Sequence, residues 1–349
     1  MGCDSKKMQH ILKILRGMSS QRYIRLGGMA MGWNLEVAEA KGDYLTETDL
    51  WRYTQQFLMN ATHTTTYKHM LMKALLECTT ELNDSGVLTF RQISRHVTKM
   101  YWNLIVTNGL RQVNQIGKLS SVEKTMLAFQ ATHEIPLTWN FDRLPDEQQQ
   151  QLIRNVNQFY KKYVYGSFYT AFGETIYSFN RKEEWVKLVP SYVVFFEKYK
   201  RVLMNVTNYQ LAVFLEKYNT REVMEKILSK IEFVSARQSL DEFKQILLSH
   251  GHPVCFYCLK PLRQIHVDHF IPWSYIQNDV LWNFVLACPS CNTSKNNRMA
   301  KIDYLYALVE RNHELRVAEQ MKTYKEAKLI HLYDYAVQNG FEANWVPKK

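Results

Sequence analysis

The sequence predicts a mainly α protein in which a long helical region precedes a small metal-stapled unit and a helical C-terminal tail. Three observations support this prediction. Apolar residues recur at helical spacing over most of the first 250 residues. Gly251 and Pro253 then interrupt that spacing. Four of the six cysteines follow as two C-x-x-C pairs in one short stretch.

The expected helices have apolar residues three and four positions apart. They cover residues 67–78, 90–104, 152–163, 211–218 and 224–231. Asp84-Ser85-Gly86 is expected to form the turn between the first two, because these residue types favour turns. A last helix is expected between Ser239, which forms a capping-box pattern with Glu242, and the helix breaker Gly251.

These patterns divide the chain into three expected parts. Residues 1–250 form a helical region of unknown role, residues 251–300 the metal-stapled unit, and residues 301–349 the helical tail. Residues 132–147, which include two prolines, break the helical pattern and are a candidate boundary inside the first part.

Aromatic and basic residues alternate at 160–163 and 196–201. Proteins that bind single-stranded nucleic acid use such residues to stack bases and contact phosphates. The same aromatics also fit the buried faces of helices, with the lysines on the solvated side, and we favour this second interpretation.

Composition and charge limit the possible functions. The net charge of +11 and the pI near 9.2 favour a polyanionic partner, although charge alone does not separate nucleic-acid binders from other basic proteins. No segment reaches the run of roughly 18 apolar residues that a membrane-spanning helix needs, and Met1–Gln21 is too polar for a secretory signal. We therefore expect a cytoplasmic protein without a membrane partner.

The clustered cysteines predict a structural metal site. Cys255 and Cys258 form one C-x-x-C pair, and Cys288 and Cys291 form the other. Cytosolic thiols are kept reduced, and four thiolates fill the tetrahedral shell of Zn²⁺ without leaving a place for water. The expected Zn²⁺ would hold together a unit that is too small to bury a large core.

A second pattern lies between and just after the cysteine pairs. It consists of Val267-Asp268-His269-Phe270-Ile271-Pro272, then Trp282-Asn283, and then Asn292-Thr293-Ser294-Lys295. Together with the cysteines, this stretch resembles the HNH endonucleases, whose ββα-metal fold carries an Asp-His pair on a strand, a central Asn, and a His or Asn on the following helix. A purely structural zinc knuckle would explain the cysteines but does not need Asp268, His269 or Asn292.

The resemblance assigns roles to the polar residues. Asp268 and Asn292 offer hard oxygen ligands for one catalytic Mg²⁺ or Mn²⁺. His269 is the expected general base, and because neighbouring residues on a strand point to opposite faces, it can address water while Asp268 holds the metal. Asn283 corresponds to the central Asn, which shapes the loop and orients this histidine.

Other residues near the motif are candidate nucleic-acid contacts. Lys295 lies three residues after Asn292 and so shares its helical face, where it is expected to contact phosphate, with Asn296 and Arg298 as further candidates. His266 precedes Asp268 by two positions and is either an additional metal ligand or a packed or solvent-facing histidine.

The resemblance implies hydrolysis of DNA phosphodiester bonds, with double-stranded DNA as the expected substrate and 5′-phosphate and 3′-hydroxyl ends as products. Restriction or anti-phage defence is the expected biological setting. Two alternatives stay open: a nuclease subunit that a protein partner activates, and a non-catalytic zinc-knuckle DNA-binding protein. Because one HNH site cuts one strand per event, double-strand breaks would need a homodimer or successive nicks.

Overall fold

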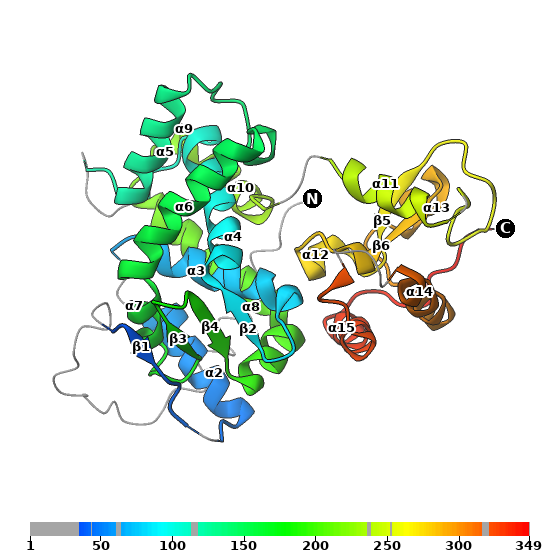
Figure 1. Ribbon diagram of the computed structural model, residues 1–349, viewed down its shortest axis with the longest axis horizontal. Coiled ribbons are helices and arrows are strands. Elements are labelled where there is room, and N and C mark those ends of the chain that lie inside the picture. Colours follow the sequence, from blue (N-terminus) through cyan, green and yellow to red (C-terminus); the bar gives the residue numbers. More distant parts are fainter. Residues whose placement is uncertain are drawn as a thin grey trace.

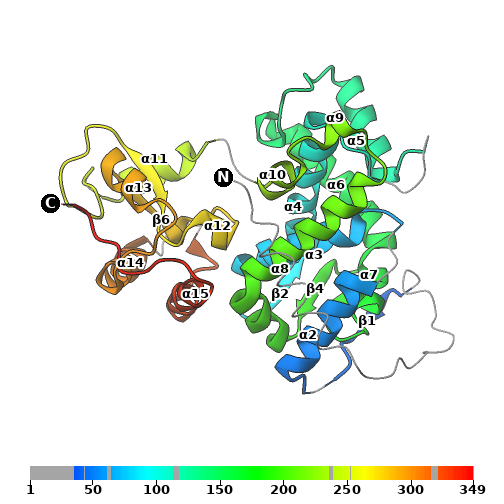
Figure 2. The same ribbon diagram turned by 180° about the vertical axis from the view of Figure 1, so that it is seen from behind.

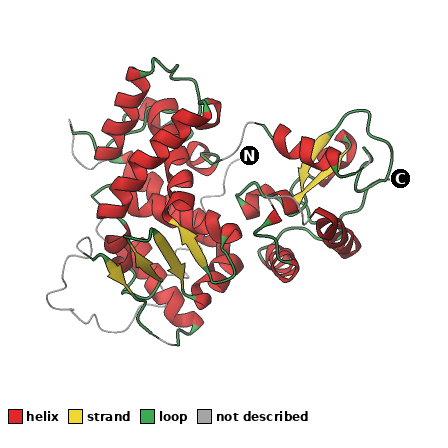
Figure 3. Ribbon diagram, in the orientation of Figure 1, coloured by secondary structure: helices red, strands yellow, loops and turns green. Residues whose placement is uncertain are grey.

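The computed structural model describes residues 35–348, except residues 43, 61–63, 113–117, 236–238, 252 and 316–320. The segment Met1–Gln21, judged above as too polar for a signal, lies outside the described residues. Helices dominate the described part, and both of its sheets are small, as Figure 3 shows. The prediction of a mainly α fold is confirmed. No helix among the described residues has the length and apolar character needed to cross a bilayer.

The first part of the chain forms a helical lobe, defined here as the described residues from 35 to 235. Its helices are α2 (Glu47–Gln55), α3 (Tyr67–Cys78), α4 (Phe90–Trp102), α5 (Ser121–Thr132), α6 (Asp146–Tyr163), α7 (Tyr165–Ala171), α8 (Pro190–Glu216), α9 (Arg221–Met224) and α10 (Ile227–Glu232). Its strands are β1 (Val37–Ala38), β2 (Val87–Thr89), β3 (Tyr177–Asn180) and β4 (Trp185–Leu188).

Helices α3 and α4 lie where the apolar spacing predicted them. Thr89 begins α4 with a capping box, in which its hydroxyl accepts from the backbone N–H of Gln92 at 3.2 Å and the Gln92 side chain accepts from the Thr89 N–H at 2.8 Å. Ile93, Val97 and Met100 are fully buried, so the predicted apolar face is the packed one.

Two of the predicted helices have different bounds in the structure. The helix expected at 211–218 is only the end of α8, which begins with Pro190 at a position where its missing N–H costs nothing. The helix expected at 224–231 is divided, because Lys226 adopts a left-handed conformation with φ 57° between α9 and α10. The spacing of the apolar residues did not predict this break.

The helical lobe contains an antiparallel sheet that the helical patterns did not predict, with strand order β1-β3-β4-β2. In β3 and β4 the buried residues alternate with less buried ones, which is the period-2 pattern of a half-buried hairpin. This alternation is therefore present in the sequence. Each strand is at most four residues long, however, which is too short for the alternation to stand out.

The segment 132–147 connects α5 to α6. Met126 of α5 and Val156 of α6 belong to the same buried apolar cluster, which extends through the whole helical lobe. Tyr160 and Phe196, one aromatic residue from each of the two aromatic-basic segments, also belong to it and are fully buried, as the packed interpretation expects. Two residues of these segments differ from that interpretation, because Tyr163 is exposed and Lys200 is buried.

The C-terminal lobe, residues 239–348 as far as described, has its own apolar cluster. Its elements are α11 (Asp241–Ser249), β5 (His266–His269), α12 (Trp273–Ile276), β6 (Phe284–Ala287), α13 (Pro289–Lys295), α14 (Ile302–Glu314) and α15 (Glu326–Gln338). Phe243 of α11, Leu308 of α14 and Leu332 of α15 all contribute to this cluster. The helices on both sides of the cysteine-rich unit therefore share its core.

The start of α11 differs from the expected capping box. The helix begins at Asp241, and the hydroxyl of Ser239 accepts from the Asp241 N–H at 3.1 Å and donates to the Asp241 carboxylate at 2.6 Å. Ser239 is thus paired with Asp241, one residue before the Glu242 of the expected capping box.

The two lobes lie side by side, as Figures 1 and 2 show from opposite sides. Helices α12 and α15 of the C-terminal lobe contact α8 of the helical lobe. The Tyr275 hydroxyl donates to the Glu197 carbonyl at 2.5 Å, and the Asn339 amide donates to the Lys198 carbonyl at 2.6 Å. Hydrogen bonds to backbone carbonyls of α8 therefore help to hold the lobes together.

Candidate active site

Strands β5 and β6 and helix α13 form a compact ββα unit. The strands pair antiparallel, with His266 opposite Ala287 and His269 opposite Phe284. Helix α13 follows β6 directly, with Pro289 at its first position. This connection lays α13 against β5, on which the Asp-His pair lies.

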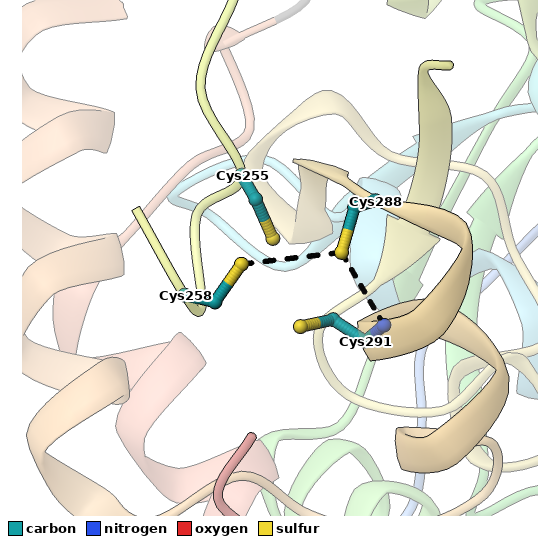
Figure 4. Close-up of side chains that lie close together, drawn as sticks. All are labelled: Cys255, Cys258, Cys288 and Cys291. Atoms are coloured by element: carbon teal, nitrogen blue, oxygen red, sulfur yellow. Dashed lines mark hydrogen bonds between the residues drawn. The ribbon is translucent and has the colours of Figure 1, made fainter. Parts of the chain in front are cut away.

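The four clustered cysteines converge from two places in the chain, as Figure 4 shows. Cys255 and Cys258 lie on the turn before β5, and Cys288 and Cys291 lie at the start of α13. The four sulfur atoms lie within 4.8 Å of one another, and the Cys258 and Cys288 sulfurs are 3.9 Å apart. Tetrahedral zinc with Zn–S bonds of about 2.3 Å places its sulfurs about 3.8 Å apart, so the donor set and its spacing fit Zn²⁺.

One face of β5 is turned toward α13. The Asn292 amide nitrogen lies 3.1 Å from Nδ1 of His266, and the Lys295 ammonium lies 3.0 Å from Oδ2 of Asp268. His266 and Asp268 are two residues apart on the strand, and Asn292 and Lys295 are three apart on the helix, so each pair shares a face. The expected metal ligands Asp268 and Asn292 are thus side chains of the same strand-helix interface.

Asp268 is held by two donors. The Tyr257 hydroxyl donates to its Oδ2 at 2.6 Å, and Lys295 pairs with the same oxygen. Burial, and next to it the negative charge of Asp268, raise the pKa of Tyr257 well above its ordinary value, so the phenol stays protonated and keeps donating. Both donors use Oδ2, and Oδ1 is the remaining carboxylate oxygen.

Lys295 differs from the exposed cation that a phosphate contact would require. Its side chain is 0% exposed, and its ammonium also donates to the His269 carbonyl at 2.8 Å. Burial lowers the pKa of Lys295, while the Asp268 carboxylate acts in the opposite direction. The physical reason for the difference is that the shared face of Asn292 and Lys295 is packed against β5 and does not face solvent.

His269 projects from the face of β5 opposite to Asp268. Its Nε2 lies 2.9 Å from Oδ1 of Asp279, and its ring packs edge-on against Phe284, with centroids 4.6 Å apart. A carboxylate only accepts hydrogen bonds, so the ring donates from Nε2, and a neutral ring with this contact has its lone pair on Nδ1. The ring is fixed both by a charged partner and by an aromatic neighbour.

Asn283 clamps the loop that follows β5. Its side-chain oxygen accepts from the Ile271 N–H at 2.8 Å, and its amide donates to the Ile271 carbonyl at 2.8 Å. Its own carbonyl accepts from the Phe270 N–H at 2.8 Å. Asn283 is fully buried and does not contact His269 through these bonds, so it acts on the loop that begins next to the histidine.

The other two candidate nucleic-acid contacts lie at the end of α13. Asn296 is exposed and terminates the helix with a positive φ of 47°. The Arg298 guanidinium donates to the carbonyls of Ser294 and Lys295, and its side chain is 38% exposed. Arg298 therefore satisfies the last carbonyls of the helix while part of its charge stays accessible.

The helices after the ββα unit brace it. Arg311 of α14 donates to the Phe284 carbonyl at 2.7 Å, and Asn312 donates to the Trp282 carbonyl at 2.8 Å. Tyr333 of α15 donates to the Ala300 carbonyl at 2.6 Å. Residues far along the chain thereby fix the start of β6 and the segment that follows α13.

A second group with metal-ligand chemistry, Cys78, Glu81 and His96, lies in the helical lobe. The two ring nitrogens of His96 are already paired with Glu77 at 2.8 Å and Glu81 at 2.7 Å, and Arg95 lies 2.6 Å from Glu81. The group therefore forms an ion-pair network whose charges are balanced without a metal ion.

Sequence reasoning missed two residues of the site. Tyr257 lies inside the first C-x-x-C pair, where only the two cysteines were considered. The signal that could have found it is a tyrosine in the turn between two metal-ligand cysteines, where it can reach Asp268. Asp279 lies in the loop between α12 and β6, and the spacing of the motif does not single it out. The fold of that loop, and not the spacing of the motif, brings Asp279 to His269.

The comparison with protein families agrees with this geometry. The family model of the HNH endonucleases matches residues 255–298, which span both cysteine pairs, β5, β6 and α13. The predicted resemblance is thereby confirmed for this segment, which is similar to the nucleases of that family. No curated protein and no solved structure matches the chain.

Proposed function

We propose that the protein is a metal-dependent HNH endonuclease that hydrolyses phosphodiester bonds in DNA. The observation that carries this proposal is the arrangement of β5, on which Asp268 faces α13 and Asn292 while His269 faces the opposite side. A structural zinc knuckle needs none of these three side chains. The match of residues 255–298 to the HNH family supports the same chemistry.

Asp268 and Asn292 would hold the catalytic Mg²⁺ or Mn²⁺. Carboxylate and amide oxygens are the ligands that such hard cations prefer, and two protein ligands leave positions for phosphate and water. When bound, this cation would polarise the scissile phosphate and stabilise its developing charge. Tyr257 and Lys295 fix the Asp268 carboxyl group in place through its Oδ2.

His269 would act as the general base. Nδ1 of its neutral ring takes a proton from the attacking water, and Asp279 stabilises the imidazolium that forms. The water oxygen bonds to phosphorus, the bond from phosphorus to the 3′ oxygen breaks, and that oxygen gains a proton from solvent. The products are a 5′-phosphate and a 3′-hydroxyl.

Zn²⁺ would be the structural metal and DNA the polyanionic partner. The four cysteine thiolates complete a tetrahedral shell, so this ion has no open position for chemistry. The net charge of +11 favours DNA, and double-stranded DNA is the substrate we propose. One site cuts one strand per event, so a double-strand break would use a homodimer or successive nicks.

A plasmid assay tests the proposal. Purified protein and its His269→Ala variant are incubated with supercoiled plasmid and Mg²⁺ or Mn²⁺, and relaxed and linear products are separated on a gel. We expect the wild type to nick the plasmid and the variant to leave it intact. Retention of the plasmid in a mobility shift without any cutting would instead favour the zinc-knuckle DNA-binding alternative.

A further inference from the structure

The residue that orients His269 belongs to a loop held by the other lobe. Asp279 lies ten residues after His269, between α12 and β6, and its side chain is 9% exposed. Its neighbour Asn278 reaches across to the helical lobe. The Asn278 amide donates to the Thr80 hydroxyl at 2.8 Å and to a Glu81 carboxylate oxygen at 2.9 Å.

We propose that Asp279 is a positioning residue for His269 and that the helical lobe sets the position of Asp279 through Asn278. The inference rests on the proposed function, since it concerns the base of that reaction. It gives the helical region a role in the chemistry: the nuclease site is complete only while the loop 277–279 is docked on Thr80 and Glu81.

The orienting contact has a definite chemical effect. Because the Asp279 carboxylate only accepts, it places the imidazole proton on Nε2 and leaves Nδ1 as the proton acceptor. Without this partner the neutral ring exchanges between two tautomers, of which one has no lone pair on Nδ1. Asp279 touches neither substrate nor metal in this scheme and acts only through His269.

The connection between Asp279 and the helical lobe is short and rigid. The Asp279 N–H donates to the Asn278 side-chain oxygen at 2.9 Å, so one asparagine binds the next residue with its oxygen and the helical lobe with its nitrogen. Glu81 in turn is held by Arg95 and His96 of α4. A displacement of α3 or α4 therefore moves the loop that carries Asp279.

A small polar pocket marks the same junction. It is lined from the helical lobe by residues that include Glu77, Arg95 and His96, and from the C-terminal lobe by Asn278 and Asp279. The pocket shows that the loop lies on the charged network of the helical lobe rather than on its apolar core. Contacts in such a network respond to the removal of a single hydrogen-bonding group.

Other contacts join the lobes independently of this loop. The Asn339 amide donates to the Lys198 carbonyl at 2.6 Å, and Lys328 lies 3.4 Å from Glu197. Removing the Asn278 side chain therefore leaves the lobes joined. Asn339→Ala is the matched control, because it removes an asparagine hydrogen bond between the lobes without touching loop 277–279.

The experiment measures plasmid nicking by the full-length wild type and by Asp279→Asn, Asn278→Ala and Asn339→Ala. The amide of Asp279→Asn is similar in shape but both donates and accepts, so it no longer enforces one tautomer. We expect kcat to fall about 100-fold in Asp279→Asn and about tenfold in Asn278→Ala, with KM within about twofold. Asn339→Ala should keep kcat within about twofold of the wild type.

A second readout does not depend on activity. In ¹⁵N spectra of the histidine side chains, with His269 assigned by its loss in His269→Ala, the wild type should show the proton on Nε2. Asp279→Asn and Asn278→Ala should show a mixture of tautomers, and thermal melts and zinc content verify that each variant is folded. This spectroscopic change separates a positioning role from a merely structural one.

The outcomes are distinct. Wild-type kcat and an unchanged tautomer in Asp279→Asn would overturn the role of Asp279. Equal losses of kcat in Asn278→Ala and Asn339→Ala would overturn the specific route through Asn278, because general docking of the lobes would then account for both. A wild type that does not nick plasmid would refute the proposed function, whereas the tautomer comparison would still decide whether Asp279 positions His269.

Discussion

The ammonium of Lys295 and the carboxylate of Asp268 form a buried ion pair, with Nζ 3.0 Å from Oδ2. This pair links the end of α13 to the middle of β5, opposite the cysteine cluster at the start of the same helix. Helix α13 is thus fastened to the strand at both ends, by thiolates suited to a metal and by a charge pair. The geometry of the candidate catalytic ligands depends on both fastenings.

The first prediction concerns this ion pair. Replacing Lys295 with Met leaves the buried Asp268 carboxylate without its cation, and this should lower the free energy of unfolding of the C-terminal lobe by about 3–5 kcal/mol. Urea denaturation monitored by tryptophan fluorescence measures the change. Lys301→Met is the control, since it breaks an exposed pair with Asp303 and should have little effect. If Lys295→Met and Lys301→Met had the same free energy of unfolding, burial would not make the Lys295–Asp268 pair more stabilising than an exposed pair.

The second prediction concerns the proposed general base. His269→Ala should reduce plasmid cleavage by about 100-fold or more while the melting temperature and the zinc content stay near those of the wild type, because the base acts in the chemical step. His266→Ala is the comparison on the same strand, because the His266 ring contacts Asn292 of α13 and lies on the face of β5 opposite to His269. Cleavage by His269→Ala within about tenfold of the wild type would refute the assignment.

The third prediction separates the two metals. Cys258→Ser should lose bound zinc and unfold the ββα unit, because a structural zinc ion contributes its binding energy to folding. Asp268→Ala and Asn292→Ala should keep about one zinc per chain and lose Mg²⁺-dependent cleavage. Elemental analysis of each purified variant, together with the plasmid assay, measures both effects.

Cys78→Ala is the control for this comparison, since Cys78 is a buried cysteine outside the four-cysteine cluster. Its zinc content should equal that of the wild type. Zinc loss in Asp268→Ala, or full zinc in Cys258→Ser, would show that the division between structural and catalytic metal is wrong.

The fourth prediction concerns pH and the network of Glu81 and His96. Burial acts to raise the pKa of Glu81, but Arg95 and His96 outweigh it and hold the pKa below the ordinary 4.5. A lowered folded-state pKa gives a stabilisation that is present above pH 4.5 and lost as the pH falls through the folded value. The difference in free energy of unfolding between the wild type and Glu81→Gln should therefore become smaller as the pH is lowered from about 6 to about 3.

The stabilisation from His96 depends on pH with the opposite sign. Burial acts to lower its pKa, but Cys78, Glu81 and the hydrogen bond with Glu77 raise it well above 6.5, so its stabilisation is complete below pH 6.5 and is lost as the pH rises through the folded value. Midpoints of urea denaturation at several pH values test both effects. A gap between the wild type and Glu81→Gln that stays constant down to about pH 3 would show that Glu81 is not paired in the folded state.

Much of the fold could be predicted from local patterns. Helices α3, α4 and α6 follow from apolar residues at helical spacing, because burial of one face decides their position. The division between α9 and α10 and the short strands β3 and β4 escaped the prediction. A left-handed residue or a strand of four residues leaves little trace in a periodicity that needs a longer window.

The candidate site was likewise predicted only in part. The cysteine pairs, the Asp268-His269 pair and the spacing of Asn292 were legible in the sequence, because metal chemistry demands particular side chains at short and regular intervals. Such spacing determines which residues share a strand or helix face. It does not determine what that face meets.

Only the tertiary structure decided which residues these side chains contact. Lys295, predicted to face phosphate, is buried against Asp268, because packing α13 on β5 removes that face from water. Asp279 reaches His269 through the fold of the loop between α12 and β6, and Asn278 reaches Glu81 from nearly two hundred positions away through the docking of the two lobes. Contacts between distant segments depend on the packing of whole surfaces, whereas the sequence by itself determined the candidate ligands, the candidate base and several of the helices.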